Sequence, residues 1–209
     1  MIRPTGADML IVIDVQNDFC PGGALAIKGG DEVVPVINAL MRRFEHVVAT
    51  QDWHPAGHHS TISAHPGRAP FDTVEASYGT QVIWPDHCIQ GTDGAALHKD
   101  LKLDPIELML RKGFRHHIDS YSAFVENDKV TSTGLAGYLL DRNVTRVFLT
   151  GLATDFCVAW SALDARRLGF EATVIEDACR AIDLDGSLDK AKAEMRAAGV
   201  EMIQAREIG

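Results

Sequence analysis

The sequence predicts an α/β fold: a doubly wound, mainly parallel sheet with helices on both faces. Two observations lead to this prediction. Short, nearly continuous runs of Val, Ile and Leu recur along the chain, and such runs are typical of strands that are covered on both faces. Between them lie segments whose apolar residues recur every three or four positions, which is the period of a helix. Strands that alternate with helices in this way indicate parallel strands joined by helical crossovers.

Six apolar runs are expected to form the strands. In chain order they are MLIVIDV at 9–15, HVVAT at 46–50, IELML at 106–110, RVFLT at 146–150, EATVI at 171–175 and, as a candidate, VEMI at 200–203. Apolar residues recur at the spacing of a helix in four segments, 31–45, 134–142, 155–168 and 187–198, which are therefore expected to be helical. Asp31 and Asp155 suit helix N-caps, and Gly169 and Gly199 suit the positions that end a helix.

The length of 209 residues and the ordinary globular composition favour one domain over residues 1–209. One segment interrupts the alternation of strand and helix. Residues 52–95 are rich in Gly, Pro, Ser and His and show neither period. Because a connection of this length inside a compact domain is usually functional, we expect an insertion that carries part of the site.

Composition also limits which binding partners and which cellular compartment are expected. With 29 acidic against 20 basic residues the formal net charge is -9, which argues against nucleic acid as a partner. No apolar segment is long enough to cross a bilayer, and the first apolar run is interrupted by Asp14, unlike that of a signal peptide. We therefore expect a cytoplasmic protein whose four scattered cysteines stay reduced.

Ligands of open α/β sheets bind beyond the carboxyl ends of the strands, so the residues at those ends are the first to consider. Asp14 ends the first strand, Lys112 follows the third, and Cys157 begins the helix after the fourth. Each has an ordinary structural explanation by itself: a turn cap, a surface lysine and a core thiol. A helix start also favours a thiolate over a thiol.

The three residues together favour catalysis. A thiolate, a carboxylate and an ammonium at one edge of a sheet match the nucleophile, base and orienting group of catalytic triads. The backbone N–H groups of Ala153 and Cys157, in the same turn, are candidates for an oxyanion hole. This arrangement suits acyl transfer.

The 52–95 segment holds five of the chain's nine histidines: His54, His58, His59, His65 and His87. In an extended chain Asp52 and His54 point the same way, so both side chains can bind one ion. Mixed carboxylate and imidazole ligands suit Zn, Fe or Mn. A solvated polar loop is the alternative, because the segment has no stronger metal motif.

Six motifs resemble those of the nicotinamidases among the isochorismatase-like cysteine hydrolases. They occur in the family's order through almost the whole chain: IDVQNDFCPGGAL at 13–25, TQDWHPAGH at 50–58, WPDHC at 84–88, RKG at 111–113, DSYSAF at 119–124 and TGLATDFCV at 150–158. The combination is highly specific for that family.

The resemblance implies a catalytic set of Asp14, Lys112 and Cys157. It also implies metal ligands at Asp52, His54 and His87, with a more variable extra ligand at His58, for which Ser60 or water is the alternative. A cis peptide between Leu152 and Ala153 is expected, with the Ala153 N–H aimed into the oxyanion hole. Phe19, Trp84 and Tyr121 match family positions that line a small, flat pocket.

The expected reaction is hydrolysis of nicotinamide to nicotinate and ammonia through a cysteine thioester. One divalent metal ion, with Zn favoured over Fe or Mn, would orient the substrate. The alternatives are another small-amide or carbamoyl amidase of the same fold and a noncatalytic metal-binding module. The sequence leaves open the number of subunits, including a homo-oligomer, and the breadth of amide substrates.

Overall fold

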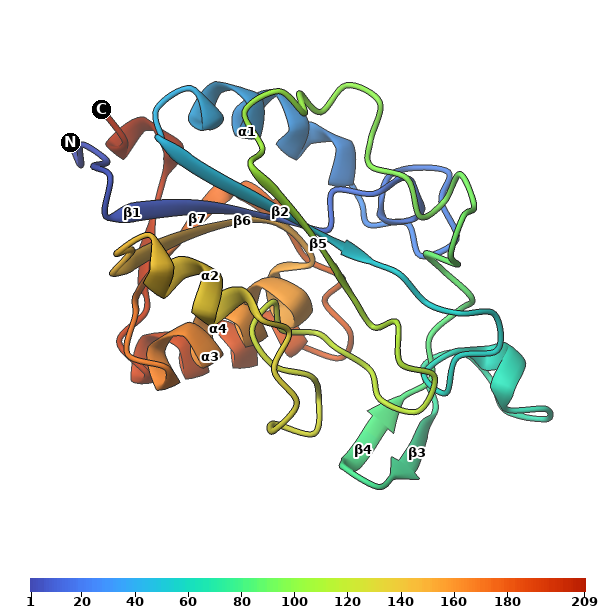
Figure 1. The fold of residues 1–209 in the computed structure, drawn as a ribbon. Helices are drawn as coiled ribbons and strands as arrows, with labels where there is room; N and C mark the ends of the chain where they lie inside the picture. The colour runs from blue at the N-terminus through green and yellow to red at the C-terminus, as the bar shows by residue number, and fades with distance from the viewer.

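The computed structural model describes residues 1–209 and contains a six-stranded sheet in the order β5-β2-β1-β6-β7-β8 (Figure 1). Every neighbouring pair in it is parallel. The predicted α/β fold with a mainly parallel sheet is therefore confirmed. The strands are β1 (Asp8–Ile13), β2 (His46–Asp52), β5 (Leu108–Lys112), β6 (Arg146–Leu152), β7 (Glu171–Arg180) and β8 (Glu201–Ile203).

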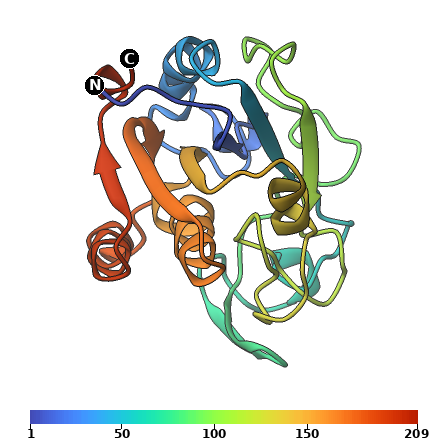
Figure 2. The same cartoon turned by 60° about the vertical axis from the view of Figure 1, so that its left-hand side comes forward.

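Helices cover both faces of the sheet, as predicted. In Figure 1, α1 (Val33–Met41) lies above the strands, and α2 (Leu135–Asp141), α3 (Ala159–Arg167) and α4 (Ser187–Ala197) lie below them. Figure 2 shows α3 and α4 side by side on the lower face. Short 3-10 turns are Asn17–Phe19, Gly30–Glu32, Ile62–Ala64 and Ala205–Glu207. None of the helices has both the length and the apolar character needed to cross a membrane.

The chain leaves the centre of the sheet in opposite directions. From β1 it passes through α1 to β2, whereas from β6 it passes through α3 to β7 on the other side. Strands β1 and β6 are neighbours, so the reversal falls between their carboxyl ends, where open α/β sheets bind ligands. Asp14 directly follows β1, and Cys157 lies in the turn after β6.

Most strand ends differ from the predicted runs by one or two residues, and β5 and β7 differ most. The third predicted strand, 106–110, is β5 at Leu108–Lys112, because it pairs with β2 from Val48 with Leu108 to Asp52 with Lys112. Lys112 is therefore the last residue of the strand. Strand β7 continues to Arg180, beyond the predicted end at 175, since it pairs again with the end of β6 after an irregularity. Pairing partners, which local patterns do not reveal, determine the bounds of both strands.

The helix after β6 also begins differently. A π-helical turn, Thr154–Val158, precedes α3, and its Val158 N–H donates to the Ala153 carbonyl five residues earlier, at 3.1 Å. Asp155 does not act as the N-cap that the sequence predicted. Its carboxylate instead accepts hydrogen bonds from the backbone N–H groups of Ile182 and Asp183 and from the hydroxyl of Ser187. These bonds attach the turn that holds Cys157 to the start of α4.

The 52–95 segment contains a hairpin that the sequence did not suggest. Strands β3 (Thr73–Ala76) and β4 (Gly79–Val82) pair antiparallel and extend away from the main sheet (Figure 1). Both are short and carry exposed polar residues, so they lack an apolar pattern. Bridges between His54 and Ile89 and between Thr61 and Trp84 fold the rest of the segment onto itself.

Gly151 is required where β6 contacts β1. Its φ is 111°, and a Cβ there would lie 2.0 Å from the Ile13 carbonyl oxygen. We expect Gly151→Ala to lower the free energy of unfolding by about 3 kcal/mol, from backbone strain and overlap together. Urea unfolding measures the change.

Gly137→Ala is the matched control. This glycine lies exposed in α2, with no atom within 4 Å of an added Cβ, so alanine should raise stability by about 0.5–1 kcal/mol. A Gly151→Ala protein as stable as the control would contradict the close approach of β6 to β1.

Candidate active site

The structure brings Asp14, Lys112 and Cys157 together at the carboxyl edge of the sheet. Lys112 Nζ lies 2.8 Å from Asp14 Oδ2 and 3.4 Å from Cys157 Sγ. The Asp14 and Asp52 carboxylates and the Cys157 sulfur lie within 4.8 Å of one another. Three strand ends, distant in sequence, therefore supply one compact group of reactive side chains.

The Lys112 ammonium links two carboxylates in the interior. It forms an ion pair with Asp14 and another with Asp52, and it donates to the Ser120 carbonyl at 2.9 Å. Burial by itself would lower the pKa of Lys112, but the two carboxylates raise it well above its ordinary value. Lys112 is therefore a permanent cation at neutral pH.

Asp14 is held in an unusual backbone conformation and a polar setting. Its φ is 48°, in the left-handed region where non-glycine residues often serve function. The Thr50 hydroxyl donates to Asp14 Oδ1 at 2.6 Å. Burial raises the pKa of Asp14 to about 6, against the lowering effect of Lys112. At neutral pH the carboxylate is ionised and more basic than an ordinary aspartate.

Cys157 differs from the expected thiolate. Its side chain is buried, and burial raises its pKa well above that of an ordinary cysteine, although Lys112 acts in the opposite direction. The effect of burial on this pKa therefore outweighs that of the helix start, which favours the thiolate. The resting group is a thiol that needs a base, and Asp14 is the adjacent carboxylate.

A second buried group adjoins the first. Asp52 Oδ2 lies 3.8 Å from His54 Nε2 and 3.9 Å from His87 Nε2. His54 Nδ1 is 2.9 Å from the Gly113 carbonyl oxygen, and His87 Nδ1 is 2.8 Å from that of Pro85. Because a carbonyl only accepts, each Nδ1 carries the proton and each Nε2 presents a lone pair toward Asp52. These three residues, called the Asp52 set below, are able to bind a metal ion.

The charge of the interior also suits a divalent cation. Asp14, Asp52 and Asp119 are buried together near a single buried cation, Lys112. Their formal charges, three negative and one positive, give this group a net charge of -2. Uncompensated buried charge is costly, and a divalent ion on the Asp52 set would neutralise it.

His58 lies beside the Asp52 set but not in it. Its Nε2 donates to the Arg115 carbonyl at 2.9 Å, and its Nδ1 is 2.8 Å from the Ser60 hydroxyl. Its donor atoms group with those of His54 and Asp119 instead. Both ring nitrogens of His58 are therefore occupied by protein groups.

Phe19, Trp84 and Tyr121 line one small pocket together with Cys157 and Ala153. The Trp84 indole donates to the Tyr121 hydroxyl at 2.9 Å, which fixes the two rings relative to each other. The same pocket contains the Asp52 set and further residues that the sequence reading missed: Leu25, Asp119, Phe156 and Ile182. Three of them lie inside the motifs quoted above: Leu25 ends IDVQNDFCPGGAL, Asp119 begins DSYSAF and Phe156 precedes the cysteine in TGLATDFCV. Their positions in these motifs were the available signal.

Gln16 is another residue of the site that the sequence did not single out, although it lies in the IDVQNDF motif. Its side chain is fully buried and forms hydrogen bonds with both backbone groups of Asp52, at 2.8 and 2.9 Å. It also donates to the Ala95 carbonyl at 2.8 Å. Gln16 therefore connects the loop after β1 to the end of β2 and holds the backbone of Asp52.

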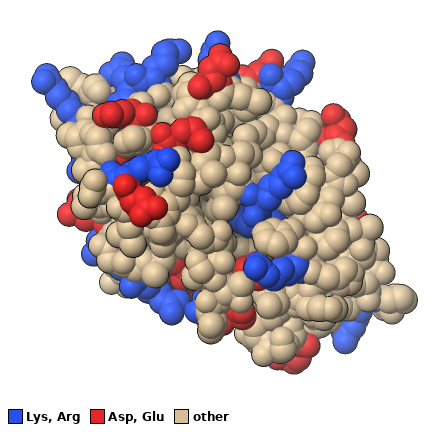
Figure 3. Space-filling view, in the orientation of Figure 1, with Lys and Arg blue, Asp and Glu red and all other residues tan.

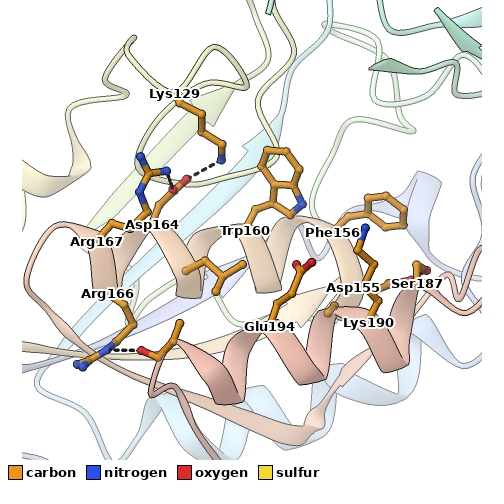
Figure 4. A pocket seen from close by; sticks show the side chains of 13 residues that line it. Lys129, Asp155, Phe156, Trp160, Asp164, Arg166, Arg167, Ser187, Lys190 and Glu194 are labelled. Atoms are coloured by element: carbon orange, nitrogen blue, oxygen red, sulfur yellow. Dashed lines mark hydrogen bonds and ion pairs between the residues drawn. The ribbon is translucent and has the colours of Figure 1, made fainter. Parts of the chain in front are cut away.

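The largest cavity lies elsewhere. A groove of about 780 Å³ runs between α3 and α4, lined by Trp160, Phe156 and charged side chains (Figure 4). Some of its charged residues have partners: Lys129 pairs with Asp164, and Arg166 donates to the Ala198 carbonyl. Neither Cys157 nor the Asp52 set lines it.

On the face drawn in Figure 3, basic and acidic side chains are interspersed, whereas the charges of the candidate active site are buried.

The cis peptide bond expected between Leu152 and Ala153 is present. Ala153 follows it on the pocket wall, and its N–H donates to no group of the protein.

Comparison with known proteins identifies relatives over nearly the whole chain. The family model of the isochorismatase domain matches residues 8–207. A nicotinamidase of Acinetobacter baylyi is 55% identical over 95% of this chain and 93% of its own length. A nicotinamidase of Escherichia coli is 43% identical over 92% of both chains.

Solved structures agree with these matches. A nicotinamidase and pyrazinamidase of Acinetobacter baumanii superposes with a TM-score of 0.96 at 54% identity, over 97% of this chain and 98% of the other. A protein of L. infantum in complex with nicotinate has a TM-score of 0.87 at 40% identity, over 100% and 98%. A pyrazinamidase of Pyrococcus horikoshii in complex with zinc has a TM-score of 0.76 at 33% identity, over 95% and 99%.

The family match covers the sheet, the 52–95 segment and the turn that holds Cys157. The solved structures named above share the fold over nearly the whole chain. The family resemblance of the sequence motifs is thereby confirmed, and the chain belongs to the isochorismatase family.

Proposed function

We propose that the protein is an amidohydrolase that converts nicotinamide to nicotinate and ammonia. The observation that carries the proposal is the meeting of Asp14, Lys112 and Cys157 in one pocket with the Asp52 set. The similar enzymes named above are nicotinamidases, and one related structure holds nicotinate. We further propose that residues 1–209 form one domain in which the 52–95 insertion supplies metal ligands.

Asp14 begins the reaction as the general base. It takes the proton of the Cys157 thiol, and the sulfur then attacks the amide carbon to form a tetrahedral intermediate. Collapse of the intermediate breaks the carbon–nitrogen bond, and Asp14 returns the proton to the departing ammonia. Water then cleaves the thioester, which releases the carboxylic acid and restores the thiol. Lys112 keeps Asp14 and the sulfur in place throughout.

The turn before α3 is proposed to stabilise the oxyanion. The N–H of Ala153 is free of protein acceptors at the wall of the pocket, and the N–H of Cys157 belongs to the same turn. Backbone donors that are already in position stabilise negative charge without reorganisation. Phe19, Trp84 and Tyr121 are proposed to enclose the flat pyridine ring, since aromatic walls suit a planar ligand.

Asp52, His54 and His87 are proposed to hold one divalent metal ion. Zinc is favoured, because it accepts mixed carboxylate and imidazole ligands and is present in a related structure; iron and manganese are the alternatives. When bound, the ion would supply Lewis-acid chemistry that orients the substrate and activates water. His58 is proposed as an extra ligand only if its Nδ1 exchanges the Ser60 hydroxyl for the metal; Ser60 or water would otherwise take that role.

Ammonia release from a small panel of amides tests the substrate. We expect turnover of nicotinamide, and of pyrazinamide as a second substrate because the similar enzyme of A. baumanii bears both names. Chelation should lower the rate at least about tenfold, and added zinc should restore it. If the metal-supplied protein released no ammonia from nicotinamide, the proposed substrate would be wrong.

Replacement of the nucleophile tests the mechanism. Cys157→Ala should lower kcat at least about 10⁴-fold, because no other group in the pocket can form the thioester. Its metal content should equal that of the wild type. Cys179→Ala, which alters another buried cysteine outside the pocket, is the control and should stay active. Near-normal turnover by Cys157→Ala would exclude Cys157 as the nucleophile.

Replacement of a ligand tests the metal site. His54→Ala should weaken zinc binding by more than about 100-fold, since loss of a direct ligand costs more than loss of an outer partner. Equilibrium dialysis with metal analysis measures the metal:protein ratio. His98→Ala, in a loop away from the pocket, should bind as the wild type does. An unchanged ratio in His54→Ala would remove His54 from the ligand set.

A further inference from the structure

Four histidines outside the Asp52 set gather on two adjoining loops: His59, His65, His116 and His117, called the surface histidine cluster. The ring centroids of His59 and His65 are 5.2 Å apart, and those of His116 and His117 are 5.1 Å apart. The backbone N–H of His59 donates to the His116 carbonyl at 3.1 Å, which joins the two loops. Nothing in the proposed reaction uses these four imidazoles.

The two pairs adjoin, because the hydrogen bond from the His59 N–H to the His116 carbonyl holds their backbones together. His65 Nε2 donates to the His59 carbonyl at 2.6 Å, so its Nδ1 keeps a lone pair. His116 and His117 are exposed, and their rings can turn toward a ligand without disturbing the core.

His58 lies between this cluster and the Asp52 set. Its ring centroid is 6.3 Å from that of His116 and 4.5 Å from that of His54. His58 and His54 are fully buried, so the imidazoles form a continuous series from solvent to the proposed metal ligand. The donor set of His54, His58 and Asp119 adjoins the Asp52 set and shares His54 with it.

We propose that the surface histidine cluster is a second, weaker binding site for a divalent transition metal and the place where the ion first binds on its way to the Asp52 set. The inference rests on the proposed metal site and not on the identity of the amide. Each step is an exchange of water or imidazole ligands on the ion, without redox chemistry.

Ligand chemistry and charge support both parts of this proposal. Imidazole binds zinc and similar divalent ions, while neutral, flexible ligands at the surface bind less tightly than a buried set with a carboxylate. The net negative charge of the buried carboxylates and Lys112 attracts a cation inward from the cluster. An ion held at the cluster is therefore concentrated beside the deeper and stronger site.

Metal binding by the metal-free full chain tests the proposal, with Zn²⁺ as the probe. The test variant is His116→Gln with His117→Gln, because both side chains are exposed and the fold does not depend on them. His46→Gln with His98→Gln is the matched control, since it removes two imidazoles that belong to neither group. Titration calorimetry measures stoichiometry and affinity, and stopped-flow mixing with a zinc indicator measures the loading rate.

We expect the wild type and the control to bind a second, weaker Zn²⁺ that the test variant lacks. Loading of the tight site should slow about tenfold in the test variant, because the local concentration of metal is lost. The affinity of the tight site for Zn²⁺ should change by less than about twofold in the test variant, because Asp52, His54 and His87 are intact. Equal stoichiometry in wild type and test variant would overturn the second site, and equal loading rates would overturn the delivery role.

A loss of tight-site affinity in proportion to the loss of rate would also overturn the proposal, because it would indicate a structural role for the loops. Ammonia release separates this inference from the proposed function. Once fully loaded, the test variant should match the wild type. If neither protein hydrolysed nicotinamide while their loading rates differed, the amidase proposal would fail and the metal-entry site would stand.

Discussion

The buried ammonium of Lys112 is the interaction on which the site depends. It contacts Asp14, Asp52 and the Cys157 sulfur, so it joins the proposed acid/base chemistry to the proposed metal ligands. Without it, two neighbouring carboxylates would face each other in the interior with no cation between them, at a high electrostatic cost. The same contact explains why Asp14 is only moderately basic: burial raises its pKa and Lys112 limits the rise.

Parallel strand pairing is what delivers these groups to one point. Lys112 pairs with Asp52 across β5 and β2, and Gly151 pairs with Ile13 across β6 and β1. The reactive groups therefore come from aligned strand ends, where adjacent side chains are held by the hydrogen bonds of the sheet. Gln16 extends this alignment beyond the strands, since it holds both backbone groups of Asp52.

The pocket combines buried walls with donors that are already oriented. Trp84 contacts Phe156 edge to face at 4.8 Å between ring centroids, and its indole is fixed by the Tyr121 hydroxyl. Burial keeps Cys157 protonated until a base acts, and it strengthens each interaction with a developing charge. Carbonyl acceptors on the outer nitrogens of His54 and His87 likewise orient both rings before any metal binds.

The sequence by itself determined the fold class and the order of the strands and helices that form the main sheet and its two faces. It also singled out Asp14, Lys112, Cys157 and the Asp52 set, because apolar periodicity and motif order can be read along the chain. Tertiary structure decided the rest. The bounds of β5, the bond between Trp84 and Tyr121 and the role of Gln16 depend on contacts between distant segments. Desolvation, which only the packed interior produces, made Cys157 a thiol where its helix position predicted a thiolate. His58 shows the same limit: its spacing suits a metal ligand, but the surrounding loops determine which atoms its two nitrogens contact.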